Sequence, residues 1–172
     1  MVDVRLRPAQ ERDLPLFYRW QDEEPHWERY NCRPVQLVHP YPAFRTRYVE
    51  ALSGGELVFS VLADGDVVGR MVAFDENPRN RSMEIGYYLA LGARGRGIGR
   101  AALVVFTGIL FTWPGRQLHK LYATTSADNM ASIAILEHAR FKLDGRLREH
   151  YLVDGQWSDQ LFYSLLRREW QP

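Results

Sequence analysis

Hydrophobic and polar residues alternate with a period of two in several stretches of the chain and follow a helical period in others. A period of two predicts strands, whose successive side chains point to opposite faces, and apolar residues three and four positions apart predict amphipathic helices. Strands are expected over residues 2–7, 56–62, 67–74, 82–91 and 119–124, with a closing hairpin over 141–153 and 157–166. Helices are expected over residues 11–21, 43–52, 97–113 and 128–139, the last with Asp128 as its N-cap.

The order of these elements predicts an α+β fold. Asp64-Gly65, between two early strands, is a hairpin signal. The later elements alternate between strand and helix, which puts one parallel pair into a mixed, mostly antiparallel sheet and requires a right-handed crossover. Splaying of that pair would leave an opening at the start of the helix over 97–113. No linker or internal repeat is present, so a single domain over residues 1–172 is expected.

The helix over 97–113 has the clearest apolar pattern. Its expected inward-facing residues are Ile98, Ala101, Ala102, Val105, Phe106, Ile109, Leu110 and Trp113. Because a strand precedes this helix, the loop between them is held by two buried elements.

That loop, residues 94–100, is the strongest functional signal. It consists of Arg94, Gly95, Arg96, Gly97, Ile98, Gly99 and Arg100. Glycines let the backbone turn sharply and approach a ligand closely. The start of a helix offers unpaired N–H groups and a positive dipole end, so the loop is predicted to bind a phosphate or pyrophosphate. The alternative is a solvated basic turn.

Other phosphate-binding motifs fit less well. Residues 97–102 read as G-x-G-x-x-A, a dinucleotide fingerprint, but no acidic residue follows at about 20 positions, where the ribose would need it. A P-loop requires a lysine after its last glycine, and none follows here.

Arg94, Gly97 and Gly99 also satisfy R-x-x-G-x-G, and at this point the chain resembles the GCN5-related N-acetyltransferases (GNAT). The similarity continues through residues 123–137, where Asn129 and Ser132 stand at familiar positions. The segments over 6–14 and 144–166 are similar to the RimJ/RimL-like branch, which contains ribosomal-protein N-terminal acetyltransferases and spermidine acetyltransferases.

This resemblance implies a twisted sheet with helices on both faces and acetyl-CoA as co-substrate. The pyrophosphate would lie on the loop over 94–100, and the pantetheine arm would pair with backbone near Leu89 and Leu91. Asn129 would reach the cofactor from the following helix, although it could instead be a second capping residue beside Asp128.

Acetyl transfer to an amine requires a neutral amine, a stabilised oxyanion and a thiolate that can leave. Glu84 is the candidate base, because the resembling family often carries a glutamate on this strand that acts through water. The alternative is a solvent-facing glutamate or a structural ion pair. By strand alternation, Glu84 shares a face with Gly86 and Tyr88, opposite Ile85 and Tyr87.

Many members of the resembling family carry a tyrosine seven residues after the asparagine to protonate the thiolate, but this chain has Leu136 there. Ser132, one turn after Asn129, is therefore the candidate group at the CoA sulfur, similar to the RimL arrangement. Its alternative role is that of a small packing residue. Arg140 stands where the family usually has glycine, which suggests a different end to this helix.

Composition narrows the class of function. Hydrophobic residues make up 46%, charged residues 25% and the net charge is +1, so neither nucleic acid nor a membrane is an expected partner. The single cysteine, Cys32, suits a reducing cytoplasm, and no targeting segment is recognised. The histidines, His26, His39, His119, His138 and His150, show no metal-binding spacing, and no metal is expected.

The segment over residues 17–44 is where the resembling family builds its acceptor cleft. It contains an aromatic cluster that is expected to be mostly core: Phe17, Tyr18, Trp20, Trp27, Tyr30, Tyr41 and Phe44. Glu23, Glu24 and Glu28 could attract a cationic amine or form a solvated acidic face.

The sequence thus predicts an acetyl-CoA-dependent N-acetyltransferase, acting by direct attack of a primary amine on the thioester, as a monomer or homodimer. A protein N-terminus, a polyamine, an amino sugar and an aminoglycoside-like molecule all remain possible acceptors. The alternative is a non-catalytic acyl-CoA-binding or regulatory module of the same fold. An oxidoreductase would need NAD(P), which the loop disfavours.

Overall fold

The computed structural model describes residues 2–24, 40–153 and 155–171. Within these ranges, seven strands form one sheet in the order β1-β2-β3-β4-β5-β7-β6. The strands are β1 (Val4–Pro8), β2 (Leu57–Ala63), β3 (Asp66–Asn77), β4 (Ser82–Leu89), β5 (Lys120–Ser126), β6 (Lys142–Val153) and β7 (Gln156–Leu166). The helices are α1 (Leu14–Glu23), α3 (Tyr41–Ser53), α4 (Ile98–Thr112) and α5 (Met130–His138), with short 3-10 turns η1 (Glu11–Asp13) and η2 (Leu91–Ala93).

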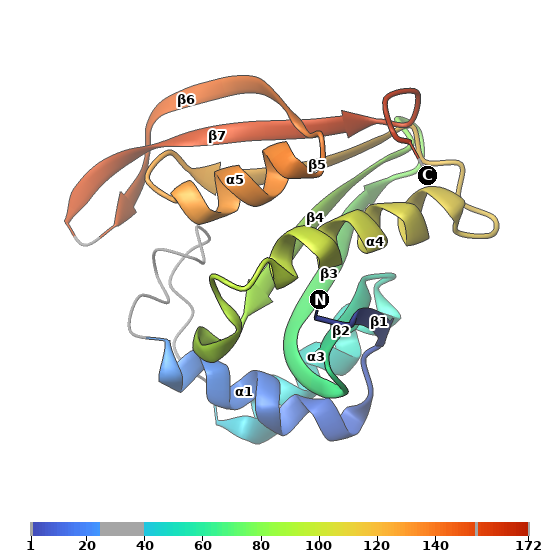
Figure 1. Cartoon of the computed structure of the whole chain (residues 1–172), viewed down its shortest axis with the longest axis vertical. Helices are drawn as coiled ribbons and strands as arrows, with labels where there is room; N and C mark the ends of the chain where they lie inside the picture. The colour runs from blue at the N-terminus through green and yellow to red at the C-terminus, as the bar shows by residue number, and fades with distance from the viewer. Residues whose placement is uncertain (1, 25–39, 154, 172) are drawn as a thin grey trace.

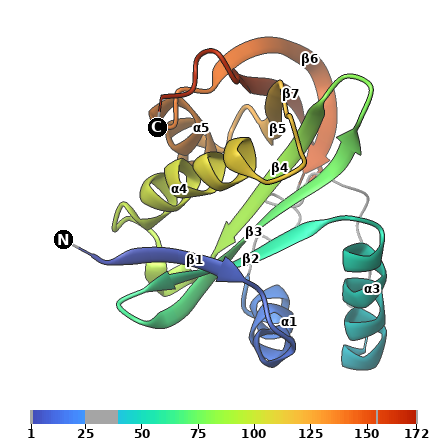
Figure 2. The same ribbon diagram turned by 90° about the vertical axis from the view of Figure 1, so that its right-hand side faces the viewer.

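Helices cover both faces of this twisted sheet, as Figures 1 and 2 show. On one face, α4 and α5 bury the main core, which includes Phe106, Leu110 and Leu136. On the other face, α1 and α3 pack over β2, β3 and β4 around a smaller cluster that includes Phe17, Trp20 and Tyr88. The expected mixed sheet with helices on both faces is confirmed. Of the helices in the described ranges, none combines the length and hydrophobicity needed to cross a bilayer.

The parallel pair is β4 and β5, and the other strand pairings among the described residues are antiparallel. The two strands pair from Ser82 with Lys120 to Glu84 with Tyr122 and then stop. Both continue beyond that point, β4 to Leu89 and β5 to Ser126. The expected splaying of this pair is confirmed, and it begins at Glu84.

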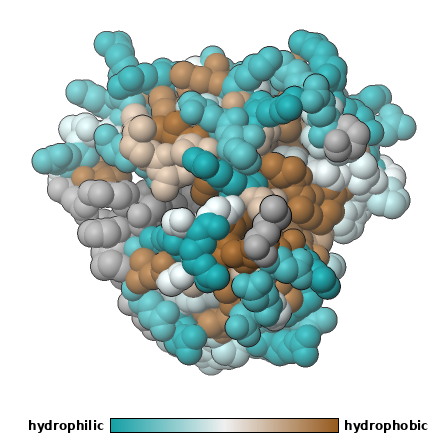
Figure 3. All heavy atoms as spheres, viewed as in Figure 1, coloured by the Kyte–Doolittle hydropathy of each residue, from teal (hydrophilic) through white to brown (hydrophobic). Residues whose placement is uncertain are grey.

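The buried stripe of α4 differs from the expected one. Its buried residues form adjacent pairs four positions apart: Ile98, Gly99, Ala102, Leu103, Phe106, Thr107, Leu110 and Phe111. Ala101 and Val105, expected to face inward, are exposed. The side chains of α4 that face the core thus recur every four residues. The expected pattern also placed residues three positions apart on this face, and some of those residues lie toward solvent. Val104 and Val105 therefore lie on the outer surface, and Figure 3 shows hydrophobic patches among hydrophilic side chains on the face where α4 lies.

Both ends of α5 also differ from expectation. The N-cap is Asn129 and not Asp128, since its side-chain oxygen accepts a hydrogen bond from the Ser132 N–H at 3.1 Å. The Asp128 carboxylate accepts one from the Ser158 hydroxyl at 2.6 Å.

At the other end of α5, Arg140 adopts a left-handed φ of 66°. The N–H groups of Arg140 and Phe141 donate to the carbonyls of Glu137 and Leu136, each at 3.0 Å. This is the ordinary Schellman motif, so the expectation of a different cap was wrong. The motif forms with arginine in the position that glycine usually occupies.

A polar network ties the first elements of the chain together. The Arg7 guanidinium on β1 donates two hydrogen bonds to the Asp13 carboxylate, at 2.6 and 2.8 Å. The Gln10 N–H and the Ser60 hydroxyl on β2 also donate to it, at 2.8 and 2.7 Å. Burial alone would raise the pKa of Asp13, but these hydrogen bonds outweigh it and lower the pKa from 3.8 to about 2.

Asp13→Asn should therefore lower the free energy of unfolding by about 2 kcal/mol near neutral pH. Because the folded pKa lies below the unfolded one, this stabilisation is complete above pH 3.8 and is lost as the pH falls through about 2. The difference in the free energy of unfolding between wild type and Asp13→Asn should shrink over that pH interval. Urea unfolding at a series of pH values measures it.

Asp3→Asn is the matched control, because the ion pair of Asp3 with Arg5 is exposed on both sides. Asp3→Asn should lower the free energy of unfolding by less than about 1 kcal/mol. A difference between Asp13→Asn and wild type that stays constant from pH 7 to pH 2 would contradict this account of the network.

Candidate active site

The loop over residues 94–100 turns through two glycines in the left-handed region. Gly95 has φ 73° and Gly97 has φ 78°. Gly97 is the N-cap of α4 and has no side chain to bond the first N–H groups of the helix. Those groups lack carbonyl partners within the helix, and the positive end of the helix dipole lies there. The loop thus presents backbone donors to an anion.

Gly99 has a different role from Gly97. It is buried, and a Cβ built on it would lie 2.7 Å from Cδ1 of Ile135 on α5 and 3.2 Å from Cδ1 of Leu89 on β4. A Cβ on Gly97 would meet nothing within 4 Å, so only its backbone angle calls for glycine there. Gly97 shapes the turn, and Gly99 lets α4 lie close to α5 and β4.

The Arg94 guanidinium is engaged with the protein itself. Its Nε donates to the Leu89 carbonyl at 3.0 Å, and Nη2 forms an ion pair with Glu24 at the end of α1. The guanidinium also lies over the ring of Tyr88, 5.3 Å from its centroid. Arg94 therefore fastens the loop to β4 and to α1. Arg96 and Arg100 have exposed side chains, and Arg96 forms a long, exposed ion pair with Asp64 at 3.8 Å.

Of the glutamates expected either to attract an amine or to form a solvated acidic face, Glu24 is buried and Glu23 is exposed. Glu24 is 4% exposed, and the Tyr88 hydroxyl donates to it at 3.2 Å. Burial, aided by the negative charge of Glu24, raises the pKa of Tyr88 to about 12. Phe17 and Trp20 are core residues as expected. Glu28, Trp27, Tyr30, Cys32, His26 and His39 lie outside the described residues.

One edge of β4 faces the gap left by β5. The Ala90 N–H donates to Val68 of β3 at 2.9 Å, so by alternation the backbone groups of Tyr87 and Leu89 point the other way. Leu91 was expected to continue this strand. It starts the turn η2 instead and is 48% exposed, because the chain must bend there to reach α4.

Ser132, in the first turn of α5, meets Tyr87 across this gap. Their hydroxyl oxygens lie 2.7 Å apart, and the Tyr87 hydroxyl also lies 3.2 Å from the Ser132 carbonyl. Burial raises the pKa of Tyr87, so the phenol stays protonated near neutral pH. Leu136 is fully buried in the main core. The phenol near Ser132 therefore comes from β4 and not from α5.

Glu84 occupies the last position of β4 that pairs with β5, and it faces away from the main core. It lies opposite Phe74 on β3 and Tyr122 on β5, and the Thr124 hydroxyl donates to its Oε1 at 3.2 Å. As expected, Tyr88 belongs to the cluster under α1 and α3, whereas Ile85 and Tyr87 pack against the core under α4.

A cleft of about 1170 Å³ joins these features. Its lining includes Glu84, Leu89, Asn129, Ser132 and the loop residues Arg94, Gly95, Gly97, Ile98, Gly99 and Arg100. Of the predicted site residues, Leu91 and Arg96 are outside this lining. Ile98 belongs to this lining although it is only 1% exposed.

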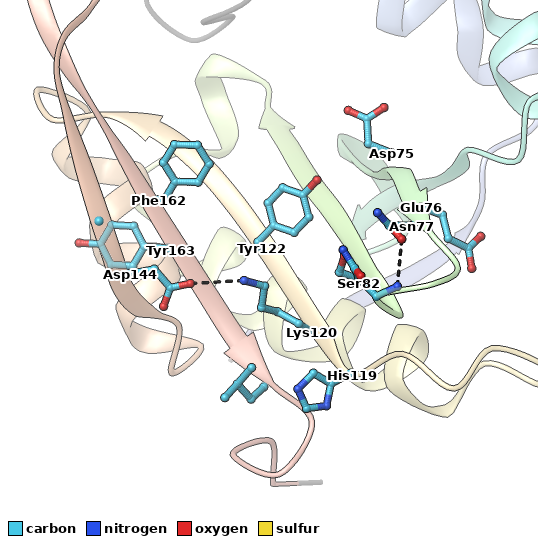
Figure 4. Close-up of a pocket in the computed structure, with 13 residues that line it drawn as sticks. Asp75, Glu76, Asn77, Ser82, His119, Lys120, Tyr122, Asp144, Phe162 and Tyr163 are labelled. Atoms are coloured by element: carbon cyan, nitrogen blue, oxygen red, sulfur yellow. Dashed lines mark hydrogen bonds and ion pairs between the residues drawn. The ribbon is translucent and has the colours of Figure 1, made fainter.

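A second hollow, of about 1010 Å³, lies at the start of β4 and β5 (Figure 4). Lys120 and Asp144 form an ion pair across it at 3.6 Å. It shares Tyr122 and Phe162 with the lining of the first cleft, so the two hollows are neighbours on this face of the sheet. No group of three or more His, Cys, Asp or Glu side chains suited to a metal occurs among the residues described.

Comparison with known proteins identifies the family. The acetyltransferase (GNAT) domain family matches residues 3–142. The chain belongs to this family. YdaF of Bacillus subtilis, whose name assigns it provisionally to the ribosomal N-acetyltransferases, is 32% identical over 130 residues, which is 76% of this chain and 68% of YdaF. Family and relatives together make the protein an acetyl-CoA-dependent N-acetyltransferase of the RimJ/RimL-like branch.

Solved structures of GNAT proteins agree with this fold. Mycobacterium smegmatis RimJ, in complex with CoA-disulfide, superposes with a TM-score of 0.83 and 30% identity, covering 98% of this chain and 84% of that one. Spermidine N-acetyltransferase from Vibrio cholerae, in complex with CoA and spermine, has a TM-score of 0.86 and covers 97% of both chains. Its 20% identity supports the fold alone.

Two side chains that line the first cleft were not singled out from the sequence. Tyr87 was read only as a residue on the opposite face from Glu84, and its contact with Ser132 joins positions 45 apart in the chain. Arg70, which lines the cleft from β3, was not singled out. An arginine at an inward position of a strand between apolar residues is the signal that could have identified it.

Proposed function

We propose that the protein transfers the acetyl group of acetyl-CoA to a primary amine by direct attack on the thioester. The observation that carries this is the convergence of the α4 N-terminus, Glu84 and the Ser132–Tyr87 pair on one cleft, where β4 and β5 stop pairing. Relatives are named for acetylating ribosomal protein uS5 and spermidine, which supports a protein N-terminus or a polyamine among the expected acceptors.

Backbone groups of the loop are the proposed pyrophosphate ligands. The N–H groups around Gly97 and Gly99 hold the anion, and the exposed Arg96 and Arg100 add positive charge. Arg94 keeps the loop in place through Leu89 and Glu24. The pantetheine arm lies along the free edge of β4 beside Tyr87 and Leu89, as an added strand would.

Asn129 orders the first turn of α5, and its amide group faces the same cleft. Its capping bond uses the side-chain oxygen, which leaves the amide N–H groups for the pantetheine or pyrophosphate region. A capping role and a cofactor role are thus compatible in this residue.

Glu84 is the proposed base. An α-amine has a pKa of about 8 and lysine about 10.4, so part of the substrate arrives protonated and must lose a proton before attack. The Thr124 hydroxyl holds one carboxylate oxygen of Glu84, and this carboxylate faces the cleft where the strands separate. It can take the proton directly or through water.

Ser132 is the proposed partner of the CoA sulfur, and Tyr87 positions it. When the phenol donates to the serine Oγ, the serine hydrogen is directed away from the phenol and toward the gap. The departing thiolate then receives a neutral hydrogen bond. Tyr87 acts through Ser132 and need not lose its own proton.

Release of CoA thiol tests the proposed reaction. Protein, acetyl-CoA and a panel of peptide, polyamine and amino-sugar acceptors should release thiol in proportion to acetylated amine, quantified by mass spectrometry. Tight CoA binding with no acetylated product from any acceptor would oppose it.

Gly97→Val should raise the acetyl-CoA KM at least tenfold, or about 1.4 kcal/mol, because a β-branched residue is strained at φ 78° and would reorient the loop donors. Gly115→Val is the matched control: Gly115 has φ 80°, equally open surroundings and no part in the cleft. Its acetyl-CoA KM should stay at the wild-type value. Equal KM values for the two variants would oppose pyrophosphate binding by the loop.

Glu84→Gln should lower kcat by about 10²-fold or more and leave the acetyl-CoA KM within threefold. The deficit should be largest at low pH, where more of the amine is protonated. Glu76→Gln, which removes a carboxylate paired with Arg116 at 3.4 Å, serves as control and should keep kcat within twofold. A Glu84→Gln enzyme with the wild-type pH–rate profile would remove Glu84 from the mechanism.

Ser132→Ala should lower kcat by about three- to tenfold, the value of a neutral hydrogen bond of about 0.5–1.5 kcal/mol. Tyr87→Phe should have a similar or smaller effect, and the double variant should resemble Ser132→Ala alone, because Tyr87 acts through Ser132. The high-pH limb of the rate profile should not move in any of them. Additive losses, or a loss above about 10³-fold, would contradict a purely orienting role.

A further inference from the structure

Three hydrogen-bond donors line the same cleft on the face covered by α1 and α3. They are Arg70 on β3, Gln21 on α1 and Tyr48 on α3. Nε2 of Gln21 and the hydroxyl oxygen of Tyr48 are buried and have no hydrogen-bond partner among the residues that the structure describes. Buried polar groups in folded proteins are nearly always satisfied, so these two atoms require an explanation.

Arg70 has no charged partner in the described part of the chain. Its guanidinium lies 5.8 Å from the centroid of the Phe17 ring, and no ion pair among the described residues includes it. Glu56 acts on it only as a more distant charge. Burial lowers the pKa of Arg70, but a guanidinium remains charged throughout the physiological range. Arg70 is half-buried, and a partly desolvated charge without an anionic partner in the described part of the chain is costly, which points to a partner supplied from outside.

The chemistry of the three groups defines that partner. A guanidinium has five N–H donors and no acceptor, and the other two groups in this lining are an amide nitrogen and a phenol hydroxyl without partners among the described residues. A ligand that satisfies all of them must offer several acceptors and a negative charge, and a carboxylate supplies two coplanar acceptors that suit arginine. A polycation such as a polyamine would bring a second positive charge to Arg70.

The register of the sheet gives the distance from this cluster to the reacting centre. Arg70 lies opposite Tyr88 on β4, whereas Glu84 lies opposite Phe74. The two sites are thus four residues apart along the same face, or about 13 Å at the usual rise of a strand. An extended peptide spans that distance in about four residues.

We propose that the acceptor is a peptide N-terminus with a carboxylate side chain within its first four residues, which Arg70, Tyr48 and Gln21 bind while the α-amine lies beside Glu84. This inference rests on the function proposed above and names its substrate class. Arg70 is the main determinant of the preference. Tyr48 and Gln21 complete the donor set.

The test uses peptides that differ only in one group. A single glutamate is placed at position 2, 3 or 4 of an otherwise neutral peptide, each peptide is matched by one with glutamine there, and spermidine is included. Wild-type kcat/KM should be at least tenfold higher for one or more glutamate peptides than for their glutamine partners. Equal values at all three positions would overturn the proposal, and so would a preference for spermidine.

Two variants locate the preference. Arg70→Gln should abolish it by lowering kcat/KM for the glutamate peptide at least tenfold, with less than a threefold change for the glutamine peptide. Tyr48→Phe should lower kcat/KM for the glutamate peptide about three- to tenfold without lowering the melting temperature, because the hydroxyl it removes has no partner in residues 2–24, 40–153 and 155–171. A Tyr48→Phe protein with an unchanged preference would overturn the assignment even if Arg70→Gln fails to fold.

Arg45→Gln is the charge-matched control. It removes a cation from α3, but Arg45 pairs with Glu11 and does not line the cleft. The glutamate preference should survive in this variant. Its loss would mean that the preference depends on the net charge of the protein and not on a contact with Arg70. Failure of the inference is distinguishable from failure of the function: thiol release without any preference rejects the acidic peptide alone, whereas no thiol release from any amine rejects the proposed reaction.

Discussion

The loss of pairing between β4 and β5 after Glu84 and Tyr122 is the constraint on which the rest of the site depends. A parallel pair needs a crossover, and here the crossover is α4, whose first turn lies at the mouth of the gap. The gap frees one edge of β4 and brings the start of α5 within reach of Tyr87. Because Gly99 has no side chain, α4 can lie close to α5 and β4. The same opening connects the two faces of the sheet, so groups on opposite faces share one cleft.

The ion pair between Glu24 and Arg94 changes how the glycine loop is understood. An arginine in a phosphate-binding motif suggests a side chain that contacts the phosphate. Here the guanidinium is held by a buried carboxylate, a strand carbonyl and the face of Tyr88. A guanidinium with these partners holds the loop at fixed distances from β4 and from the end of α1. In the proposed pyrophosphate site, the anion would bind to backbone N–H groups that are already oriented, so little order would be lost when it binds.

The local elements could be predicted from the sequence because their signals are local. Asp64-Gly65, with φ values of 52° and 97°, forms the expected two-residue turn from Ala63 to Asp66. The strand, loop and helix around Gly97 were also predictable, since glycine spacing and apolar periodicity act over a few residues. The pairs that shape the site are distant in the chain. Glu24 and Arg94 are 70 positions apart, and an acidic run gives no sign of which member will be buried. Asn129 displaced Asp128 as the cap because Ser158, from β7, holds the carboxylate of Asp128.

The cleft also has an uneven charge distribution that the overall net charge of +1 conceals. A carboxylate, Glu84, lies where the strands separate, and a guanidinium, Arg70, lies four residues away along the same face. Electrostatic complementarity contributes more to register and orientation than to affinity. A substrate with an amine at one end and a carboxylate at the other would therefore enter in one direction, with the nucleophile at the end where acetyl-CoA arrives. A uniformly cationic substrate would meet attraction at Glu84 and repulsion at Arg70, so these two charges act on orientation and selection together.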